Sequence, residues 1–317
     1  MTSELPPALK AAIQGELAGA SRRGLAERAA ATSAAYRAGG TSASAIKARE
    51  DALAYALARL PATYAATAAV FAEARLRAPG FAPASLLDAG CGPGGASWAA
   101  TAAWPSLADI AWFDASLPFL DLAQRLAEGQ LQARTIRGDL TAGGFPRADL
   151  VVASYALAEI APAGQGAVVD ALWTACDGLL AVVEPGTPAG WARLMAARDR
   201  LTAAGAALLA PCPHARACPL EPPDWCHFSV RLPRSRDHRL AKGAEAPFED
   251  EKYAYLLAAR PQVGEPAVGR VLARPRVGKP GIELKLCGAE GVERRFVARR
   301  DKAGHAVARR LAWGDAI

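Results

Sequence analysis

The sequence has no long hydrophobic run and no leader pattern at its start. No apolar stretch among its 317 residues approaches the length of a membrane-spanning helix, which takes about 20 residues. The first residues contain no basic patch followed by a hydrophobic stretch, as a secretory signal would. We therefore expect a cytoplasmic protein with no membrane partner.

Aromatic residues are scarce as well, at 7% of the chain, and alanine dominates the apolar fraction. Alanine favours helices but gives little volume, so leucine, valine and tryptophan must carry the packing. A chain of this length that is 52% hydrophobic can still form one large or two modest domains with a true core. The composition is that of a globular protein.

What the sequence does contain is an apolar run that closes on an acid and a glycine turn, at residues 86–95. It predicts a strand, a sharp turn and a helix, because glycine has no Cβ and lets the backbone lie close to a ligand. Asp88 would repel a pyrophosphate but suits a ligand that carries an amino group and a sulfonium. The run resembles motif I of the class I S-adenosylmethionine (SAM) methyltransferases, in which Asp88, Gly90, Gly92 and Gly94 would bind SAM.

Helical spacing fills residues 1–80, and strand and helix signals alternate from residue 85 onward. We expect strands at residues 86–89, 110–113, 133–137, 150–154 and 179–183, with helices such as 118–127 and 166–175 between them. This alternation predicts a Rossmann-like α/β fold whose ligand lies at the carboxyl ends of parallel strands. Residues 253–258 and 282–286 would complete a seven-stranded sheet.

Polar side chains follow the expected strands. Asp114 ends the second strand about twenty residues after the glycines, where an acid can accept hydrogen bonds from both ribose hydroxyls. Asp139 follows the third strand, near the expected adenine amino group, and Ser154 follows the fourth, where the methyl group would face its acceptor. Single acids after strands are also common helix caps. Glu184, after the fifth strand, would lie at the rim of the site.

Two motifs of base methylation are missing. Enzymes that methylate exocyclic base nitrogens usually have Asn/Asp-Pro-Pro-Tyr/Phe after the fourth strand, where this chain has Ser154-Tyr155. Methylation of cytosine carbon 5 needs a nucleophilic cysteine in a Pro-Cys or Thr-Cys setting, which Cys176 does not match. No catalytic base or nucleophile is identified, and Cys91 and Cys176 are interpreted as small buried apolar residues.

The other four cysteines are Cys212, Cys218, Cys226 and Cys287, separated by 5, 7 and 60 residues. Cytoplasmic thiols stay reduced, so the clustering of the first three indicates metal rather than disulfides. Structural zinc sites usually use knuckles with two to four residues between ligands, which are lacking here. Loose spacing suits a 4Fe-4S cluster better. Zinc bound by three cysteines and either His214 or His227 remains an alternative, as do unligated thiols.

The excess of positive over negative charge is confined to the last third of the chain. Residues 211–317 hold 20 lysines and arginines against 13 acidic residues, while residues 1–210 hold 17 against 18. A basic segment beside a neutral one favours an anionic partner such as RNA, although it can also be a solvated surface. The arginines around the cysteines, Arg231, Arg234 and Arg236, are candidates for phosphate contact.

Several of these stretches together resemble the methyltransferase-like protein 17 family of mitochondrial small-ribosomal-subunit assembly factors and its bacterial relatives. The resemblance rests on the blocks CPHARACPL (212–220), WCHFS (225–229), EPGTP (184–188) and WGD (313–315), and covers about residues 30–315. It implies a SAM methyltransferase fold, a 4Fe-4S cluster on Cys212, Cys218, Cys226 and Cys287, and association with small-subunit ribosomal RNA. The expected regions are 1–80 (helical), 81–210 (SAM-binding core), 211–245 (cysteine-rich iron-sulfur loop) and 246–317 (last strands and basic tract).

Three functions remain open at this stage. The first is a SAM-dependent methyltransferase acting on ribosomal RNA in assembly or translation, with the cluster as a structural staple. The second is a non-catalytic iron-sulfur assembly factor that uses the same fold to hold RNA. The third is a small-molecule methyltransferase with a zinc-stapled lid. In each case we expect a monomer.

Overall fold

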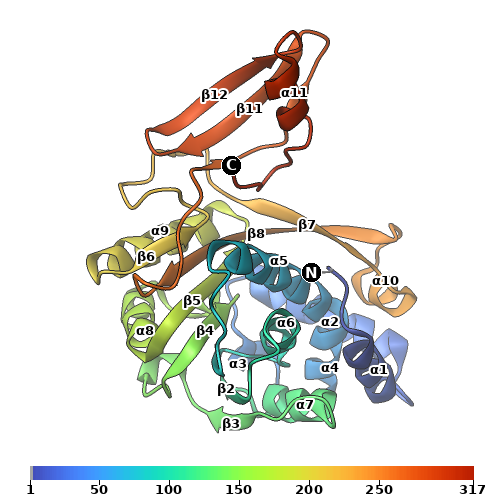
Figure 1. Ribbon diagram of the computed structural model, residues 1–317. Helices are drawn as coiled ribbons and strands as arrows, with labels where there is room; N and C mark the ends of the chain where they lie inside the picture. The colour runs from blue at the N-terminus through green and yellow to red at the C-terminus, as the bar shows by residue number, and fades with distance from the viewer. Residues whose placement is uncertain (1–2) are drawn as a thin grey trace.

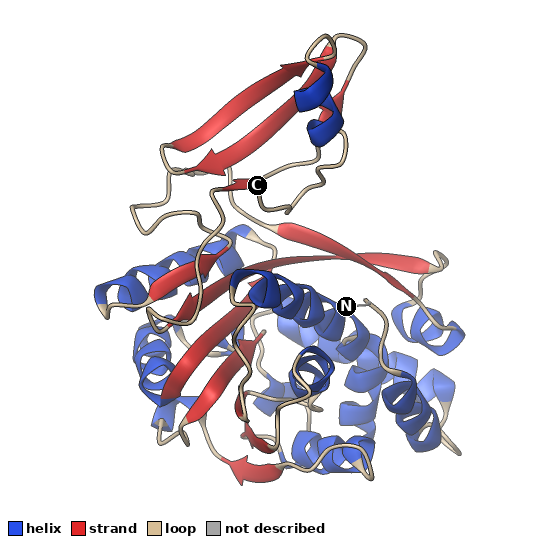
Figure 2. Cartoon of the chain, viewed as in Figure 1, coloured by secondary structure: helices blue, strands red, loops and turns tan. Residues whose placement is uncertain are grey.

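A mixed sheet of eight strands forms the centre of the molecule, with helices on both faces, and a sheet of four strands projects from it (Figures 1 and 2). The computed structural model describes residues 3–317, so Met1 and Thr2, which begin the predicted helical region, lie outside the described residues. The central sheet has the order β3-β2-β1-β4-β5-β8-β6, with β7 also paired to β8. It is the Rossmann-like arrangement predicted from the sequence.

The first five strands run parallel to one another, and all five were predicted within a few residues. They are β1 (Ser85–Ala89), β2 (Asp109–Asp114), β3 (Arg134–Arg137), β4 (Ala148–Ser154) and β5 (Cys176–Pro185). The helices between them are α6 (Gly95–Ala103), α7 (Leu117–Ala127), α8 (Pro162–Ala175) and α9 (Pro188–Ala203). Because helices cover both faces, the central strands are apolar on both sides.

The last strands of the central sheet differ from the prediction. β8 (Phe248–Ala259) contains residues 253–258, which were predicted to join this sheet, and it lies antiparallel to β5. Its other edge pairs with β6 (Ala207–Ala210) over residues 257–259 and with β7 (Phe228–Pro233) over residues 248–253. The sheet therefore has eight strands rather than seven. The prediction was wrong because β6 is a short alanine- and leucine-rich segment after an alanine-rich helix, which does not stand out as a strand.

Residues 282–286, predicted as the last strand of this sheet, instead belong to the projecting sheet. That sheet contains β9 (Gly269–Val271), β10 (Arg276–Val277), β11 (Gly281–Gly288) and β12 (Gly291–Ala298), and α11 (Lys302–Ala308) packs on it. Residues 248–253 and 257–259 on this edge of β8 are already paired with β7 and β6, and β11 finds its partners among its own neighbours in sequence.

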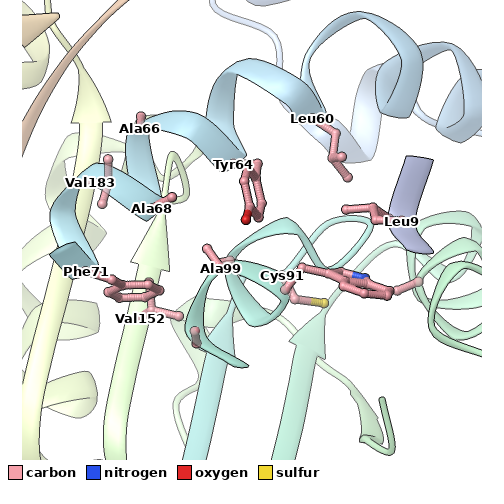
Figure 3. Close-up of a cluster of buried hydrophobic side chains, with 14 of the residues drawn as sticks. Leu9, Leu60, Tyr64, Ala66, Ala68, Phe71, Cys91, Ala99, Val152 and Val183 are labelled. Carbon is pink, nitrogen blue, oxygen red and sulfur yellow. The ribbon is translucent and has the colours of Figure 1, made fainter. Parts of the chain in front are cut away.

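In the described part of the chain, five helices precede the sheet, in the region where the sequence predicted helical structure. They are α1 (Pro7–Glu16), α2 (Arg22–Arg37), α3 (Ser42–Ala45), α4 (Arg49–Ala58) and α5 (Leu60–Arg77). Helix α5 lies against the sheet, where Phe71 packs near Val152 of β4 and Val183 of β5 (Figure 3). Alanines on α5 and α6 keep these helices close to the strands beneath them. Within residues 3–317, none of the helices combines the length and apolarity that a bilayer crossing requires.

A glycine in β5 sets how closely the chain packs at the start of that strand. A Cβ on Gly178 would come within 2.6 Å of the Phe81 ring and 2.7 Å of the Asp149 carbonyl oxygen. We expect Gly178→Ala to lower the free energy of unfolding by about 2–3 kcal/mol in urea titrations. The matched control is Gly15→Ala in α1, where nothing lies within 4 Å. It should be neutral or stabilising by up to about 1 kcal/mol, and equal effects of the two changes would contradict the argument.

Candidate functional site

A cavity of about 320 Å³ lies at the carboxyl ends of β1, β2 and β4, where the parallel strands predicted a ligand. The glycine turn, the strand ends and a segment from the N-terminal helices form its walls. The lining residues are Thr41, Ser42, Ala43, Tyr55, Gly90, Gly92, Asp114, Ala115, Ser116, Phe119, Gly138, Asp139, Leu140, Ser154, Tyr155, Ala156, Glu159 and Ile160. Its size is at the lower end of the range for small-molecule sites.

The glycine turn at the start of α6 needs glycine for its backbone. Gly90, Gly92 and Gly94 have φ angles of 72°, 52° and 83°, in the left-handed region that glycine adopts without strain. A Cβ on Gly90 would also lie 2.8 Å from the Cβ of Ala156. Gly90 and Gly92 line the cavity, whereas Gly94 is the N-cap of α6 and lies against the Trp112 ring.

Asp88 is almost completely buried, at 1% exposure, beside the glycine turn. Its Oδ2 accepts hydrogen bonds from the Ser97 amide (3.0 Å) and hydroxyl (2.7 Å). Its Oδ1 has no hydrogen-bond partner among residues 3–317. Burial raises the pKa of Asp88 to about 7. The carboxyl group lines a recess of about 30 Å³ that shares Gly90, Gly92 and Ser154 with the main cavity. A buried carboxylate oxygen without a donor is suited to a cationic ligand.

Asp114 and Asp139 also line the main cavity, with different local roles. Asp114 accepts backbone hydrogen bonds from Gly92 and from Ser116, both at 2.8 Å, so it ties β2 to the glycine turn. Burial raises the pKa of Asp114. Asp139 caps the short helix η1 (Leu140–Ala142) by accepting from the Thr141 amide and hydroxyl. The capping role considered for single acids after strands therefore holds for Asp139, which faces the cavity as well.

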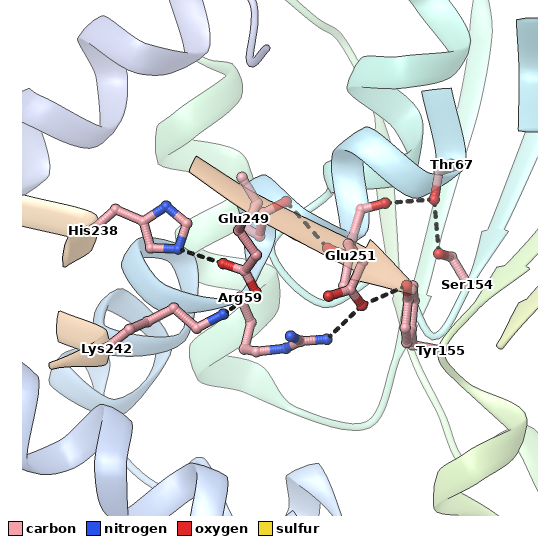
Figure 4. Close-up of polar contacts among 10 residues, drawn as sticks. Arg59, Thr67, Ser154, Tyr155, His238, Lys242, Glu249 and Glu251 are labelled. Atoms are coloured by element: carbon pink, nitrogen blue, oxygen red, sulfur yellow. Dashed lines mark hydrogen bonds and ion pairs between the residues drawn. The ribbon is translucent and has the colours of Figure 1, made fainter. Parts of the chain in front are cut away.

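The turn after β4 carries a polar network that the sequence did not predict (Figure 4). Ser154 shares a hydrogen bond of 2.9 Å with Thr67. Tyr155 has a φ of 59°, an unfavourable conformation for a bulky residue, and donates its hydroxyl hydrogen bond to Glu251 of β8. Arg59 pairs with the same carboxylate at 3.3 Å. No local sequence signal relates Glu251 to Arg59, because the two residues are 192 positions apart.

A short segment from the N-terminal helices covers the cavity. Ser42, at the start of α3, donates from its amide (2.8 Å) and its hydroxyl (2.6 Å) to Glu159 of the short helix η2 (Leu157–Glu159). The Tyr36 hydroxyl lies 2.8 Å from the Ser42 hydroxyl. Burial raises the pKa of Glu159. One carboxylate thus holds residues 41–43 over the strand ends, and we call this segment the cover.

We expect Glu159→Ala to loosen the cover. Without the carboxylate, the Ser42 amide loses its acceptor, and its hydrogen exchange should become faster by about tenfold or more. The measurement is amide exchange followed by mass spectrometry on peptides that span residues 38–47. Replacing the exposed Glu128 by alanine is the control and should leave these peptides unchanged. Equal exchange in both variants would show that Glu159 does not hold the cover.

Four cysteines line a second cavity, of about 30 Å³. Cys212, Cys218 and Cys226 lie in the loop between β6 and β7, and Cys287 comes from β11 in the projecting sheet. Burial and the neighbouring thiols raise the pKa of Cys226 well above its usual value. Among residues 3–317, no three or more histidine, cysteine, aspartate or glutamate side chains are arranged to hold a metal ion as they stand. Cys91 and Cys176 are buried elsewhere, as predicted.

Two buried arginines hold the cysteine loop from opposite sides. Arg198 of α9 donates to the carbonyl oxygens of His214 (3.0 Å) and Arg216. Arg270 of β9 donates to the Pro211 carbonyl at 3.2 Å and pairs with Glu73 of α5. Both side chains are about 1% exposed. Glu73 offsets the charge of Arg270, whereas the acid that pairs with Arg198 is the exposed Asp199, so Arg198 is the less compensated cation beside the thiols.

Glu184 and two of the arginines near the cysteines pair with other residues of the chain. Glu184 is fully buried and pairs with Arg193 at 2.6 Å, so it does not lie at the rim of the cavity. The strand β5 extends to Pro185, past its predicted end at residue 183, so Glu184 is a buried residue of the strand. Arg231 and Arg234, expected to contact phosphate, pair with Asp250 and Glu249 on the adjacent strand β8. Strand pairing between β7 and β8 decides these partners.

Comparisons with known proteins relate the chain to ribosome assembly. The family model of the mitochondrial small ribosomal subunit Rsm22 matches residues 49–317. The chain is 30% identical over 295 residues to a human mitochondrial ribosome assembly protein, methyltransferase-like protein 17, covering 84% of this chain. It spans 62% of the length of that relative.

Solved structures of methyltransferases are similar at lower identity. Magnesium protoporphyrin IX methyltransferase from Synechocystis, with bound SAM, has a TM-score of 0.42 at 17% identity, covering 63% of this chain and 80% of that one. Precorrin-6y C5,15-methyltransferase from Geobacter metallireducens has a TM-score of 0.40 at 13% identity, covering 61% of this chain and 86% of that one.

Proposed function

Since the chain belongs to the mitochondrial small ribosomal subunit Rsm22 family, we propose that it binds SAM and acts on small-subunit ribosomal RNA during ribosome assembly, as a methyltransferase-like protein. The observation that carries the proposal is the cavity at the strand ends, with a buried, half-unpaired Asp88 beside a glycine turn and Asp114 on the next strand. We further propose that the protein works in the cytoplasm as a monomer.

In this proposal each predicted residue contacts a different part of the SAM molecule. Asp88 Oδ1 would accept from the ligand's amino group, and Asp114 would accept from the ribose hydroxyls in place of its present backbone donors. Gly90 and Gly92 let the backbone lie against the ligand, Gly94 supports the turn, and Asp139 and Ser154 complete the wall. SAM, when bound, supplies an electrophilic methyl group on its sulfonium. The chain's own contribution is to bind and orient, since no side chain is assigned as a catalytic base.

A non-catalytic role has its own support in the structure. The cover closes the cavity, and the Tyr155 hydroxyl, beside the expected methyl position, is already engaged by Glu251. In this second candidate the protein binds SAM and RNA as an assembly factor without methyl transfer. The third candidate, a small-molecule methyltransferase with a zinc-stapled lid, gains nothing from the family membership.

Ribosomal RNA from a deletion strain separates the two main candidates. A missing methyl mark on small-subunit RNA, restored by the wild-type gene, would establish the enzyme. Defective small subunits that carry every mark would establish the assembly factor. Small subunits that are normal in amount, sedimentation and methylation would contradict both and remove the proposed function.

We also propose that Cys212, Cys218, Cys226 and Cys287 hold a 4Fe-4S cluster. Two features support the fit: the thiols line one cavity although Cys287 is distant in sequence, and the buried Arg198, whose acidic partner Asp199 is exposed, lies beside what would be an anionic centre. The present cavity has about the volume of one water molecule, so the loop would have to open around a cluster. The cluster would staple the projecting sheet to the core.

Zinc remains the alternative occupant. The Nε2 atom of His214 lies 4.0 Å from the Cys287 sulfur, so His214 could replace one thiolate in a zinc site. His227 is less suited, because it stacks on Trp225 and contacts Trp313 edge-on. Metal content and colour of the purified protein distinguish the two occupants.

A further inference from the structure

The projecting sheet has one covered face and one open face. Side chains alternate between the faces of a strand, and Ile282, Leu284 and Leu286 of β11 form a small core with Ala308 of α11. The residues between them, and their partners across the antiparallel pairs, therefore point away from α11. They are Arg276, Glu283, Lys285, Cys287, Val292, Arg294 and Phe296. At one end Cys287 lines the cysteine cavity and Lys285 pairs with Asp224 of the cysteine loop. We call the remaining surface, formed by Arg276, Glu283, Arg294 and Phe296, the open face. Figure 1 shows the sheet standing clear of the body, with α11 along it.

A large aromatic side chain is exposed on the open face. Phe296 is 58% exposed, although it stands in an ordered strand opposite Glu283. Its ring lies beside Gly281, where a Cβ would come within 2.8 Å of the ring. The glycine gives the ring room against the strand. A single exposed apolar side chain is common on protein surfaces, so the ring supports a binding surface only together with the arginines that flank it.

Cations surround Phe296 on the same surface. Arg294 and Arg276 share the single carboxylate of Glu283, at 2.5 Å and 3.7 Å, while their side chains stay 61% and 74% exposed. One acid therefore orients two guanidinium groups beside the ring and leaves the row positive.

The end of the sheet adds three more cations. A backbone hydrogen bond of 2.8 Å from Arg299 to Pro280 brings the turn containing Lys279 beside Arg299 and Arg300. All three are exposed, and none forms an ion pair with any residue in the described range 3–317. We call these three residues the tip.

The excess charge of the chain is concentrated in this sheet. Residues 269–317 hold 12 lysines and arginines against 5 acidic residues, whereas residues 211–268 hold 8 against 8. Near the cysteine loop, Arg231 and Arg234 pair with Asp250 and Glu249. A polyanion would therefore be attracted to the projecting sheet rather than to the loop.

We propose that the open face binds a single-stranded segment of RNA, with a base stacked on Phe296 and phosphates held by Arg276, Arg294 and the tip. The inference rests on the proposed function for the presence of RNA and adds which surface reads it and in what form. An unpaired base can lie on an exposed ring between guanidinium groups, whereas the bases of a duplex are stacked on one another and unavailable. Charge alone would suit either form, so the ring decides for the single strand.

The test measures binding of the full-length, metal-loaded protein to a fluorescent single-stranded RNA of about 12 nucleotides and to the matching duplex, by anisotropy. We expect the single strand to bind more tightly. Phe296→Ala should weaken single-strand binding roughly 5- to 100-fold with an unchanged salt slope, and Phe296→Tyr should restore it. The double change Arg299→Ala/Arg300→Ala should instead reduce the slope of log K against log salt by about 1 to 1.5.

The control removes the same charge from the other side of the sheet. The control variant is Arg309→Ala/Arg310→Ala. These two arginines lie at the end of α11, which packs on the covered face. Their replacement should change single-strand binding less than twofold. Unfolding midpoints confirm that each variant folds. Equal binding by wild type and Phe296→Ala, or tighter binding of the duplex, would overturn this inference while leaving the proposed function intact. If Phe296→Ala lost the binding of a ribosomal protein but kept the binding of RNA, this inference would be overturned as well. A wild-type protein that binds no RNA would remove the proposed function itself.

Discussion

Replacing Cys226 by serine is expected to abolish metal binding and to destabilise the protein. Cys226 lines the cavity with the other three cysteines, and burial together with these neighbouring thiols raises the pKa of Cys226. A bound cluster would instead hold the four cysteines as thiolates. The purified variant should lack iron and the broad absorbance near about 400 nm that iron-sulfur centres give. Because metal binding is coupled to folding, its unfolding midpoint should fall by about 10 °C or more.

Cys176→Ala is the matched control for this experiment. Cys176 is fully buried at the start of β5 and does not line the cysteine cavity, so the variant should keep its iron and colour. Iron analysis and absorbance spectra of anaerobically purified proteins give the result. Colourless wild-type protein containing zinc would contradict the cluster but keep the site. Unchanged iron in the Cys226 variant would remove Cys226 from the ligand set.

Replacing Asp88 by asparagine is expected to weaken SAM binding about 100-fold, measured by calorimetry. The substitution keeps the size of the side chain and an oxygen for the Ser97 donors, but removes the negative charge that would face the amino group of SAM. Loss of one partner of a buried charged pair typically costs about 3 kcal/mol or more.

The pH dependence provides a second readout of the same residue. The pKa of ligand-free Asp88 is about 7, because burial disfavours its charge. A cationic ligand prefers the ionised form, so the affinity of the wild type should rise roughly tenfold from pH 6 to pH 8. In the ligand-free protein the pH trend of folding stability is opposite. The pKa of Asp88 is higher in the folded protein than in the unfolded chain, so ionisation of Asp88 lowers the free energy of unfolding. This stability is lost as the pH rises through about 7. Asp88→Asn should show neither trend.

Asp170→Asn is the control for a carboxylate outside the cavity. Asp170 is exposed and pairs with Arg200 on the surface, so its loss should leave SAM affinity and its pH profile as in the wild type. Equal affinities of the wild type and Asp88→Asn would remove Asp88 from the ligand contacts. A pH rise that persists in Asp88→Asn would assign the titration to another group, first of all Asp114, whose pKa burial also raises.

Much of the fold could be predicted because its signals are local. The apolar runs of β1 to β5 are separated by helical segments, and a parallel sheet follows from that alternation. The glycine turn was equally visible, since the left-handed φ angles at Gly90, Gly92 and Gly94 require that residue type. The place of β11 could not be read in this way. Its alternating pattern fits the edge of either sheet, and pairing of β6 and β7 along β8 removes one choice.

The network around the cavity depended on tertiary structure for a similar reason. Glu159 and Ser42 are 117 residues apart, and Arg59 and Glu251 are 192 apart. The sequence around Glu159 does not indicate its partner, because other acidic residues occur in the same kind of alanine-rich stretch. Only the packing of the N-terminal helices over the strand ends makes Glu159 the anchor of the cover.

By itself, the sequence determined the chemical character of each group: an acid before a glycine turn, thiols without disulfide partners, and cations gathered near the end of the chain. Only the tertiary structure decided which of these groups meet. It brought Cys287 to the cysteine loop, paired Arg231 and Arg234 with acids of β8, and left Phe296 exposed beside Arg276 and Arg294. The physical reason is that residue chemistry and backbone preference act over a few residues, whereas charge neutralisation and burial depend on neighbours that strand pairing supplies from distant parts of the chain.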